Sequence, residues 1–169
     1  MADVFTKAKR SEVMSRIRSR GNQATELALA KLLRAHGITG WRRQIQICCR
    51  ARSPLRAGGK ISKAGAHGVS RPAFRVRPDF IFPKFRLAVF VDGCFWHGCP
   101  RHATTPKNNH RFWQKKLSAN KRRDALVTRT LRRNGWRVVR FWECAVQQAI
   151  KQPGNAARLW QRLQRPLGA

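Results

Sequence analysis

Acidic residues are scarce in this chain of 169 residues, which contains 7 Asp and Glu against 37 Lys and Arg and has a net charge of +30. A compact chain with so large an excess of positive charge repels itself unless a polyanion offsets the charge, so nucleic acid is the leading partner. A membrane surface is the weaker alternative, because no basic amphipathic helix with a clean apolar face stands out. No acid occurs from Leu27 to Pro78. The few that exist are therefore candidates for specific roles rather than routine surface charge.

The chain also lacks a run of about 18 apolar residues and a signal-peptide pattern, which predicts a cytoplasmic, nucleoid-associated protein without a membrane partner. Thiols stay reduced in the cytoplasm, so the five cysteines favour metal binding or redox chemistry over a disulfide framework. A length of 169 residues with an apolar fraction of 42% predicts one globular domain over residues 1–169.

Hydrophobic periodicity predicts two helices and three strands in the better patterned parts of the chain. The helices are expected over residues 22–37 and 108–133, the first ended by glycine and the second by an Asn-Gly pair. Strands are expected over residues 77–82, 86–91 and 136–142. The apolar residues of the longer helix that should face the core are Phe112, Trp113, Leu117, Leu126 or Val127, and Leu131.

The other segments are shorter or carry less pattern. Residues 1–21 are basic and polar and are predicted to form a flexible N-terminal arm, whereas residues 48–75 are predicted to form a long basic loop insertion. A short strand is expected over residues 41–47 and a last helix over residues 155–163. This order of elements predicts an α/β fold with a central mixed sheet flanked by helices.

Two carboxylates mark the ends of neighbouring predicted strands. Asp79 follows Pro78 at the start of one strand, and Asp92 ends the next. Many nucleases place carboxylates around Mg²⁺ in this way, and the ion then bridges the scissile phosphate and lowers the pKa of a water molecule for attack. The lysine usual two residues after the second acid is missing, because Cys94 stands there. The alternative is that each aspartate only forms a turn at a strand end.

Two further residues are candidates for the same chemistry. His97 lies close to Asp92 in the sequence and is the nearest candidate for a general base or for a group that positions water. It could equally be a further metal ligand or a structural bystander. Glu26 lies in the first turn of the helix predicted over residues 22–37, where complementing the helix dipole would by itself explain an acid.

Thiol and imidazole side chains are concentrated just after Asp92. Cys94, Cys99 and His102 have the spacing Cys-x4-Cys-x2-His, and Cys144 follows a predicted strand that could lie alongside. Four such ligands make a closed tetrahedral zinc site, which holds a loop rigid and contributes folding free energy. The spacing is not a common zinc-finger pattern, and Cys144 is the ligand least supported by it. Unrelated buried cysteines and a surface histidine are the alternative.

Aromatic residues lie among these ligands. Phe95 and Trp96 occupy the loop that zinc would stiffen, and exposed apolar side chains of a basic protein can wedge between base pairs. Trp113, near the start of the long predicted helix, could join them. For Trp113 alone, however, packing in the core is the better interpretation. For Phe95 and Trp96 the two interpretations are evenly matched.

The residues around this cluster resemble a known family. The run Phe90-Val91-Asp92-Gly93-Cys94-Phe95-Trp96-His97-Gly98-Cys99-Pro100 closely resembles the signature of the very short patch repair DNA mismatch endonucleases. The resemblance covers roughly residues 8–145, apart from the long basic loop. Further similar blocks lie within residues 10–26, 77–80, 112–124 and 135–144.

This resemblance implies a variant of the restriction-endonuclease-like fold with a structural zinc ion and Mg²⁺-dependent cleavage. The implied substrate is double-stranded DNA with a T:G mismatch, which arises when 5-methylcytosine deaminates. The family nicks one strand on the 5′ side of the mismatched thymine. The resemblance further implies a monomer with a functional link to a cytosine-5 DNA methyltransferase.

The resemblance also assigns roles to individual residues. It implies that Asp79 is the principal Mg²⁺ ligand, that His97 activates or orients the attacking water, and that Glu26 assists through water around the metal. Further Mg²⁺ ligands would be the backbone carbonyl of Val91 and the carboxylate of Asp92. The implied zinc ligands are Cys94, Cys99, His102 and Cys144. The implied DNA-contacting residues are the wedge Phe95, Trp96 and Trp113, with Lys116 and Asn120 recognising or positioning the mispair.

Two departures from the family pattern accompany these expectations. Residues 48–75 look longer and more basic than the usual connection, and an acid at Asp92 is not shared by all members. Two competing functions are a non-catalytic, zinc-stabilised DNA-binding protein and a related nicking endonuclease with another lesion or sequence specificity. A pure binding protein would have no need of Asp79, His97 and Glu26 together.

Overall fold

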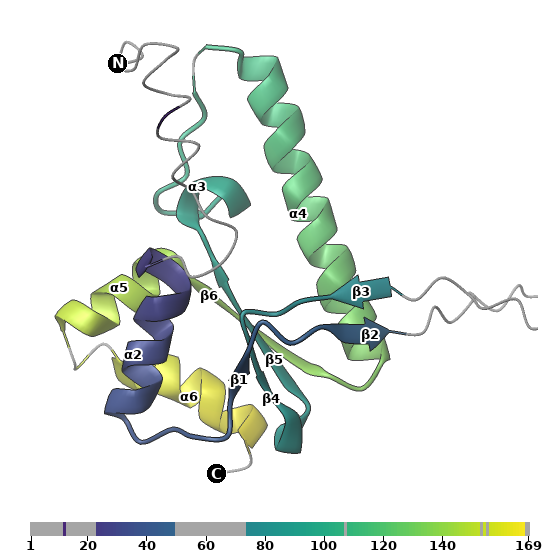
Figure 1. The fold of residues 1–169 in the computed structure, drawn as a ribbon. Helices are drawn as coiled ribbons and strands as arrows, with labels where there is room; N and C mark the ends of the chain where they lie inside the picture. Colours follow the sequence, from purple (N-terminus) through teal and green to yellow (C-terminus); the bar gives the residue numbers. More distant parts are fainter. Residues whose placement is uncertain are drawn as a thin grey trace, which may run out of the picture.

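The computed structural model describes residue 12 and residues 23–49, 74–106, 108–152, 154 and 156–167. Across this part of the chain a mixed sheet and helices form an α/β fold, which confirms the class predicted from the sequence (Figure 1). Apart from Glu12, the predicted arm over residues 1–21 and most of the predicted basic loop lie outside the described residues. No helix in the described ranges is long and apolar enough to cross a membrane.

A four-stranded sheet forms the centre of the fold. Its strands are β1 (Arg42–Arg43), β4 (Phe80–Phe82), β5 (Leu87–Asp92) and β6 (Arg137–Trp142). They lie in the order β1-β4-β5-β6, with β4 antiparallel to both of its neighbours and β5 parallel to β6. All three residues of β4 and five of the six in β5 are buried, because both faces of the sheet are covered there.

A separate two-stranded sheet pairs β2 (Ile47–Cys49) with β3 (Phe74–Val76). The predicted loop over residues 48–75 is therefore wrong at both of its ends. The first and last residues of β2 are buried and the middle one is exposed, which is the alternation expected of a strand. The strand is too short for this alternation to be recognised in the sequence. The strand predicted over residues 41–47 is divided between β1 and β2 because Gln44 has a φ of 55°.

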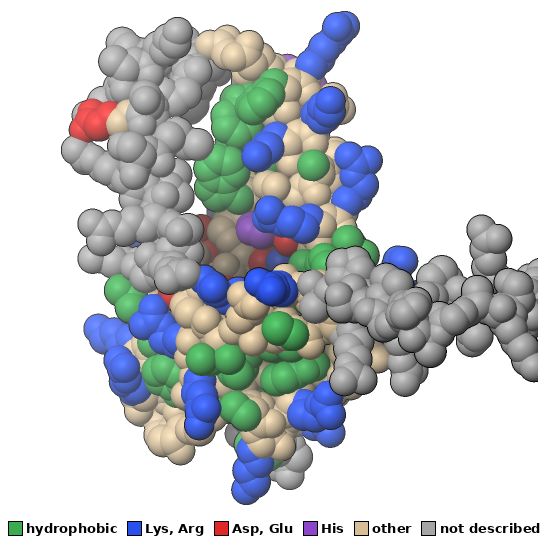
Figure 2. Space-filling view, turned by 45° about the vertical axis from the view of Figure 1, so that its right-hand side comes forward, with side chains coloured by type: hydrophobic (Ala, Val, Ile, Leu, Met, Phe, Trp, Pro, Cys, Tyr) green, Lys and Arg blue, Asp and Glu red, His purple; other side chains and the backbone are tan. Residues whose placement is uncertain are grey.

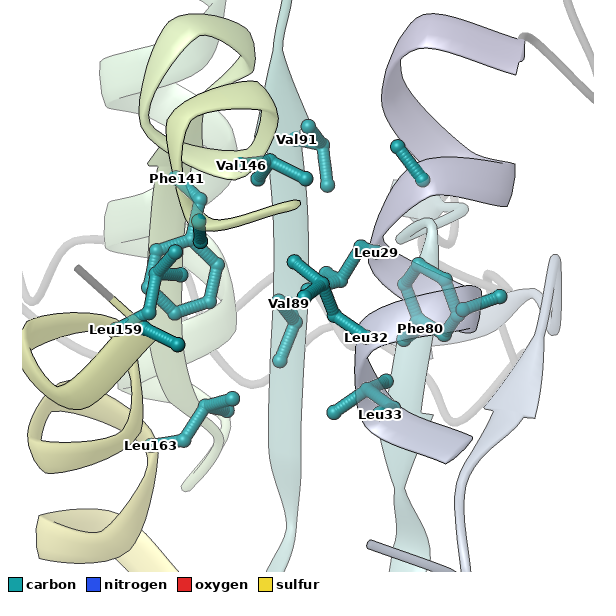
Figure 3. Packing of buried hydrophobic residues seen from close by; sticks show 14 of the residues in the cluster. Leu29, Leu32, Leu33, Phe80, Val89, Val91, Phe141, Val146, Leu159 and Leu163 are labelled. Carbon is teal, nitrogen blue, oxygen red and sulfur yellow. The ribbon is translucent and has the colours of Figure 1, made fainter. Parts of the chain in front are cut away.

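Helices cover one face of the four-stranded sheet. They are η1, a π-helical turn (Gln23–Leu27), α2 (Ala28–Ala35), α5 (Glu143–Lys151) and α6 (Ala156–Leu167). The core beneath them joins Leu29 and Leu33 of α2 to Val89 of β5, Phe141 of β6 and Leu163 of α6 (Figure 3). Each of these side chains contributes roughly 1.5–3 kcal/mol on burial. The sequence analysis did not predict α5.

The long helix α4 (His110–Arg133) covers the other face only near its C-terminal end, where Leu131 is buried and Val127 packs against the second core. Towards its N-terminus the helix extends beyond the sheet (Figure 1). Phe112 is 60% exposed and Leu126 is 51% exposed, so the prediction that Phe112 faces the core is wrong. Of the alternatives Leu126 and Val127, the structure selects Val127.

A short helix, α3 (Cys94–His97), begins directly after β5. Gly98 ends it with a φ of 67°, a left-handed conformation that glycine adopts without strain. Because α5 begins directly after the parallel strand β6, both connections leave the sheet at the same edge. The carboxyl ends of parallel strands are where α/β proteins place their ligand sites, and the predicted site residues gather at this edge.

Candidate functional site

Asp79 lies in a bend just before β4, where its Oδ2 accepts a hydrogen bond of 2.7 Å from the backbone N–H of Val91. The pKa of Asp79 is raised from 3.8 to about 6. Burial is the largest cause and the nearby charges of Glu26 and Asp92 add to it, whereas the Val91 hydrogen bond and the charge of Arg140 oppose the rise. The three predicted carboxylates thus act on one another. A carboxyl group that ionises this reluctantly gains from a bound cation.

Glu26 is buried in η1, with only 4% of its surface exposed. Its Oε2 accepts a hydrogen bond of 3.0 Å from Nη2 of Arg43, which lies on β1 beside β4. An acid that served only the helix dipole could remain in solvent. The carboxylate of Glu26 is instead directed into the fold, where Arg43 offsets its charge.

Asp92 ends β5 and pairs with Arg140 of the neighbouring strand β6. Arg140 Nε donates to Asp92 Oδ2 at 2.7 Å, and its Nη2 donates to Oδ1 at 2.5 Å. The same Nη2 lies 3.1 Å from Oδ1 of Asp124 on α4. Burial lowers the pKa of Arg140, but its hydrogen bonds and ion pairs with the two aspartates outweigh burial and raise that pKa above its ordinary value. Arg140 therefore ties the sheet to α4 through two carboxylates.

His97 belongs to the same network. Its Nδ1 lies 2.5 Å from Asp124 Oδ2 and 3.7 Å from Asp92 Oδ1. Burial raises the pKa of Asp124, but the hydrogen bond with His97 and the positive charge of Arg140 outweigh burial and lower it. An ionised carboxylate only accepts hydrogen bonds, so the proton of a neutral His97 lies on Nδ1 and Nε2 is left as the acceptor.

Sequence reasoning missed Asp124 and Arg140 as members of the site. Asp124 had one available signal, because it is one of only 7 acids in the chain. Arg140 had a weaker one, as a charged residue between the apolar residues Val139 and Phe141 of a predicted strand. Neither signal predicts that Asp124 contacts His97 or that Arg140 contacts Asp92, because the residues of these pairs are 27 and 48 positions apart in the sequence.

The four predicted zinc ligands come together at the same edge of the sheet. The ligand atoms of Cys94, Cys99, His102 and Cys144 all lie within 4.8 Å of one another. Cys99 Sγ is 3.8 Å from His102 Nδ1 and 3.9 Å from Cys144 Sγ. Bonds of about 2.3 Å to a tetrahedral zinc ion place sulfur atoms about 3.8 Å apart, so these separations fit a metal such as zinc.

The two sulfurs of this cluster that precede His102 differ in acidity. Burial raises the pKa of the Cys94 thiol to about 12. Burial also raises the pKa of Cys99, but hydrogen bonds from the backbone of Arg101 and from His102 outweigh it and lower that pKa to about 6. A cysteine binds a metal as the thiolate, and the lowered pKa of Cys99 favours that form.

The aromatic residues form a cluster between α3 and α4. The ring centroid of Phe95 lies 5.1 Å from that of Trp96 and 5.3 Å from that of Trp113. Phe112 joins them, 5.4 Å from Trp113. Asn120 is buried, and its Nδ2 donates a hydrogen bond of 2.9 Å to the backbone carbonyl of Trp96. This bond fixes α3, which carries Phe95 and Trp96, to α4. Trp113 therefore packs in a separate aromatic cluster and not in either sheet core.

The surface around these residues combines three chemical characters. Figure 2 shows histidine and acidic side chains in a recess, with hydrophobic side chains above it and lysine and arginine side chains around and below it. The acids and the imidazole can hold a metal and move a proton, and the positive surface attracts a phosphate chain. This combination is what a DNA endonuclease requires.

Comparison with known proteins agrees with that class. The model of the family described as DNA mismatch endonuclease Vsr matches residues 2–49 and 65–102. The Type II nicking enzyme V.NmeDIP of Neisseria meningitidis serogroup C is 35% identical over 95% of this chain and 98% of its own length. The DNA mismatch endonuclease Vsr of Escherichia coli K12 is 32% identical over 92% of this chain and 83% of its own. The chain belongs to the Vsr family of DNA endonucleases.

A third relative matches only in part. The Type II nicking enzyme V.NaeI of Lentzea aerocolonigenes is 48% identical over 69 residues. That match covers 41% of this chain and 42% of V.NaeI, so the chain spans less than half of that relative. The names of V.NaeI and V.NmeDIP identify nicking enzymes and do not specify the DNA sites that they nick.

Proposed function

We propose that the protein is a Mg²⁺-dependent endonuclease with a restriction-endonuclease-like fold that nicks one strand of double-stranded DNA on the 5′ side of the thymine in a T:G mismatch. The observation that carries the proposal is the pairing of His97 with Asp124 beside the perturbed carboxyl of Asp79. The near full-length match to an Escherichia coli DNA mismatch endonuclease supports the mismatch as the substrate. A protein that only binds DNA would gain nothing from this arrangement.

In this proposal Asp79 and the backbone carbonyl of Val91 hold Mg²⁺, and Glu26 acts on the ion through water. The ion would polarise the scissile phosphate and acidify a water molecule. The hydrogen bond from Val91 N–H to Asp79 orients that carboxylate. Both oxygens of Asp92 accept hydrogen bonds from Arg140, so Asp92 serves to position Arg140 rather than to bind the metal.

His97 is the proposed acceptor of the proton from the attacking water. Its Nδ1 contacts Asp124, which leaves Nε2 free to take a proton. Once Nε2 is protonated, the imidazolium lies against the Asp124 carboxylate, and their attraction stabilises the charged state. Arg140 holds Asp124 from the other side and fixes the orientation of the pair.

Cys94, Cys99, His102 and Cys144 are the proposed zinc ligands. Cys94 begins α3 and Cys144 is the second residue of α5, so zinc would clamp the two connections that leave the sheet. A hydrogen bond of 3.1 Å from Cys94 N–H to Glu143 Oε2 already joins the same two helices. Bound zinc would thereby fix the position of Phe95 and Trp96, which follow Cys94 in α3.

Phe95, Trp96 and Trp113 are proposed to wedge into the stack of bases at the mismatch. Their mutual packing keeps the cluster ordered before DNA binds, which lowers the cost of ordering it on binding. Lys116 is exposed on the same helix and would contact the mispair or a phosphate beside it. Asn120 is buried and would position the mispair through its hydrogen bond to Trp96.

A second specificity remains a candidate because two of the relatives described above, V.NmeDIP and V.NaeI, are named Type II nicking enzymes. In that case the protein would nick a mismatch within a particular recognition sequence. In either case we propose a cytoplasmic, nucleoid-associated monomer that is functionally linked to a cytosine-5 DNA methyltransferase, since deamination of the methylated base produces the mismatch. The domain proposed over residues 1–169 would carry all of this activity.

The test is strand-specific nicking of end-labelled duplexes that differ only in one T:G or T:A pair, with and without Mg²⁺. We expect a single nick 5′ to the mismatched thymine, only with Mg²⁺. Asp79→Asn should bind the mismatched duplex and not nick it. Equal nicking of the T:A duplex, or full nicking by Asp79→Asn, would exclude the proposed activity.

A further inference from the structure

A cavity of about 300 Å³ opens beside the proposed catalytic histidine. Its lining includes His97 and Asp124 together with three cationic side chains, those of Lys121, Arg140 and Arg162. A space of this size can hold a phosphate group and the water around it.

Two of the three cations are already engaged. Arg140 is bound by Asp92 and Asp124. Arg162 donates from Nη2 to the backbone carbonyl of Arg140 at 3.0 Å, and its guanidinium lies 5.4 Å from the ring centroid of Phe141. Lys121, by contrast, has no carboxylate within ion-pair distance among the described residues. Its ammonium is therefore the charge in this cavity that an external anion can neutralise.

The backbone leaves room for this lysine. A Cβ atom added at Gly98 would lie 2.4 Å from Cε of Lys121 and 2.8 Å from its Nζ, closer than van der Waals contact allows. Any side chain at Gly98 would therefore displace the ammonium. Gly98 follows His97 directly, and the hydrogen bond from Asn120 to Trp96 holds α4 against this turn. Packing against Gly98 thus places the ammonium of Lys121 in the cavity that His97 also lines.

We propose that Nζ of Lys121 binds a non-bridging oxygen of the scissile phosphate and stabilises the negative charge that develops there during hydrolysis. This inference rests on the proposed nicking activity. Lys121 neither donates nor accepts a proton in this role, since it acts as a fixed charge aimed at the phosphate. It would supply, from α4, the positive charge that many magnesium nucleases obtain from a lysine at the position that Cys94 occupies here.

The first test compares nicking of a T:G duplex by the wild type, Lys121→Met, Lys121→Arg and the control Lys115→Met, which replaces another exposed lysine of α4. Rates are measured in single turnovers with Mg²⁺ and enzyme in saturating excess, so that weaker binding does not lower them. We expect Lys121→Met to be slower by about 100-fold, the cost of one charge-stabilising donor. Lys121→Arg should recover at least part of the rate, and Lys115→Met should keep it.

The inference is overturned if Lys121→Met nicks within tenfold of the wild type at saturation, while the proposed function stands. If the wild type does not nick, a second measurement tests the role of Lys121 separately from the proposed nicking function. Amine acylation followed by mass spectrometry reports the reactivity of Lys121 with and without a 20–30 base-pair duplex in Mg²⁺-free buffer. Protection of Lys121 by DNA, with Lys31 on α2 left reactive, supports a phosphate contact, and unchanged reactivity of Lys121 overturns it.

Discussion

Replacing Asp79 with asparagine should stabilise the protein while it abolishes nicking. Burial and neighbouring acids raise the pKa of Asp79 from 3.8 to about 6. At about 1.4 kcal/mol for each pKa unit, ionising this group in the folded state costs up to about 3 kcal/mol. Asparagine carries no charge, and its carbonyl oxygen can still accept the hydrogen bond from Val91 N–H. The penalty should therefore disappear without loss of the local geometry.

The effect has a definite dependence on pH. A folded pKa above the unfolded value means that Asp79 favours the folded state least once the pH exceeds about 6. Below about pH 4 the carboxyl is protonated in both states, so the wild type and Asp79→Asn should be equally stable with respect to this group. The excess stability of the variant should grow between these pH values and stay constant above them.

The assay is denaturant unfolding of both proteins across this pH range, in buffer without Mg²⁺. An increase of about 3 kcal/mol in the free energy of unfolding corresponds to a rise in Tm of roughly 6–12 °C for a chain of this size. Asp124→Asn is the matched control, because the pKa of Asp124 is lowered in the folded state. That variant should be less stable than the wild type at neutral pH, and the difference should shrink as the pH falls.

Two results would refute this reasoning. If Asp79→Asn were no more stable than the wild type at pH 8, then burial of the carboxyl would carry no penalty. If both aspartate variants changed stability in the same direction, then the substitution itself and not the electrostatic environment would be responsible. Added Mg²⁺ should narrow the gap between the wild type and Asp79→Asn, because only the wild type would bind the ion at this carboxylate.

Three other substitutions test separate parts of the site. Cys94→Ser should reduce bound zinc, measured by atomic emission, below that of Cys48→Ser, which alters an exposed thiol outside the cluster; equal zinc in both would remove Cys94 from the ligand set. Arg140→Leu should lower the free energy of unfolding by about 3–5 kcal/mol because Asp92 is left buried without its partner, and adding Asp92→Leu should recover much of the loss. Trp113→Ala should slow nicking of a T:G duplex by a larger factor than it changes the rate of inactivation by unfolding. An unchanged nicking rate would exclude the wedge role.

Sequence reasoning succeeded where the residues of a feature are close together in the chain. The family and the enzyme class follow from residues 90–100, where the acid, thiols, aromatics and histidine are contiguous. The α/β class follows from the periodicity of the longer elements. In both cases a short segment contains the whole signal.

It failed where a partner comes from a distant element. The contact between His97 and Asp124 exists only because α4 packs against α3, and no local pattern encodes that packing. The exposure of Phe112 has the same origin, since a helix that extends past the sheet can look amphipathic along its whole length. The strands β2 and β3 were not predicted, because three residues are too few to display the alternation of buried and exposed side chains that identifies a strand.

The first residues of α5 link the sulfur cluster to the main core, and this link determines how the protein would respond to loss of metal. Cys144 and Val146 are two residues apart on that helix, one in the sulfur cluster and the other fully buried in the main core. A change at the cluster is therefore transmitted to the packing of α5 against α2 within one helical turn. We therefore expect loss of metal and global unfolding to be cooperative, so that a metal-depleted protein would unfold as a whole instead of losing only the structure of residues 94–102.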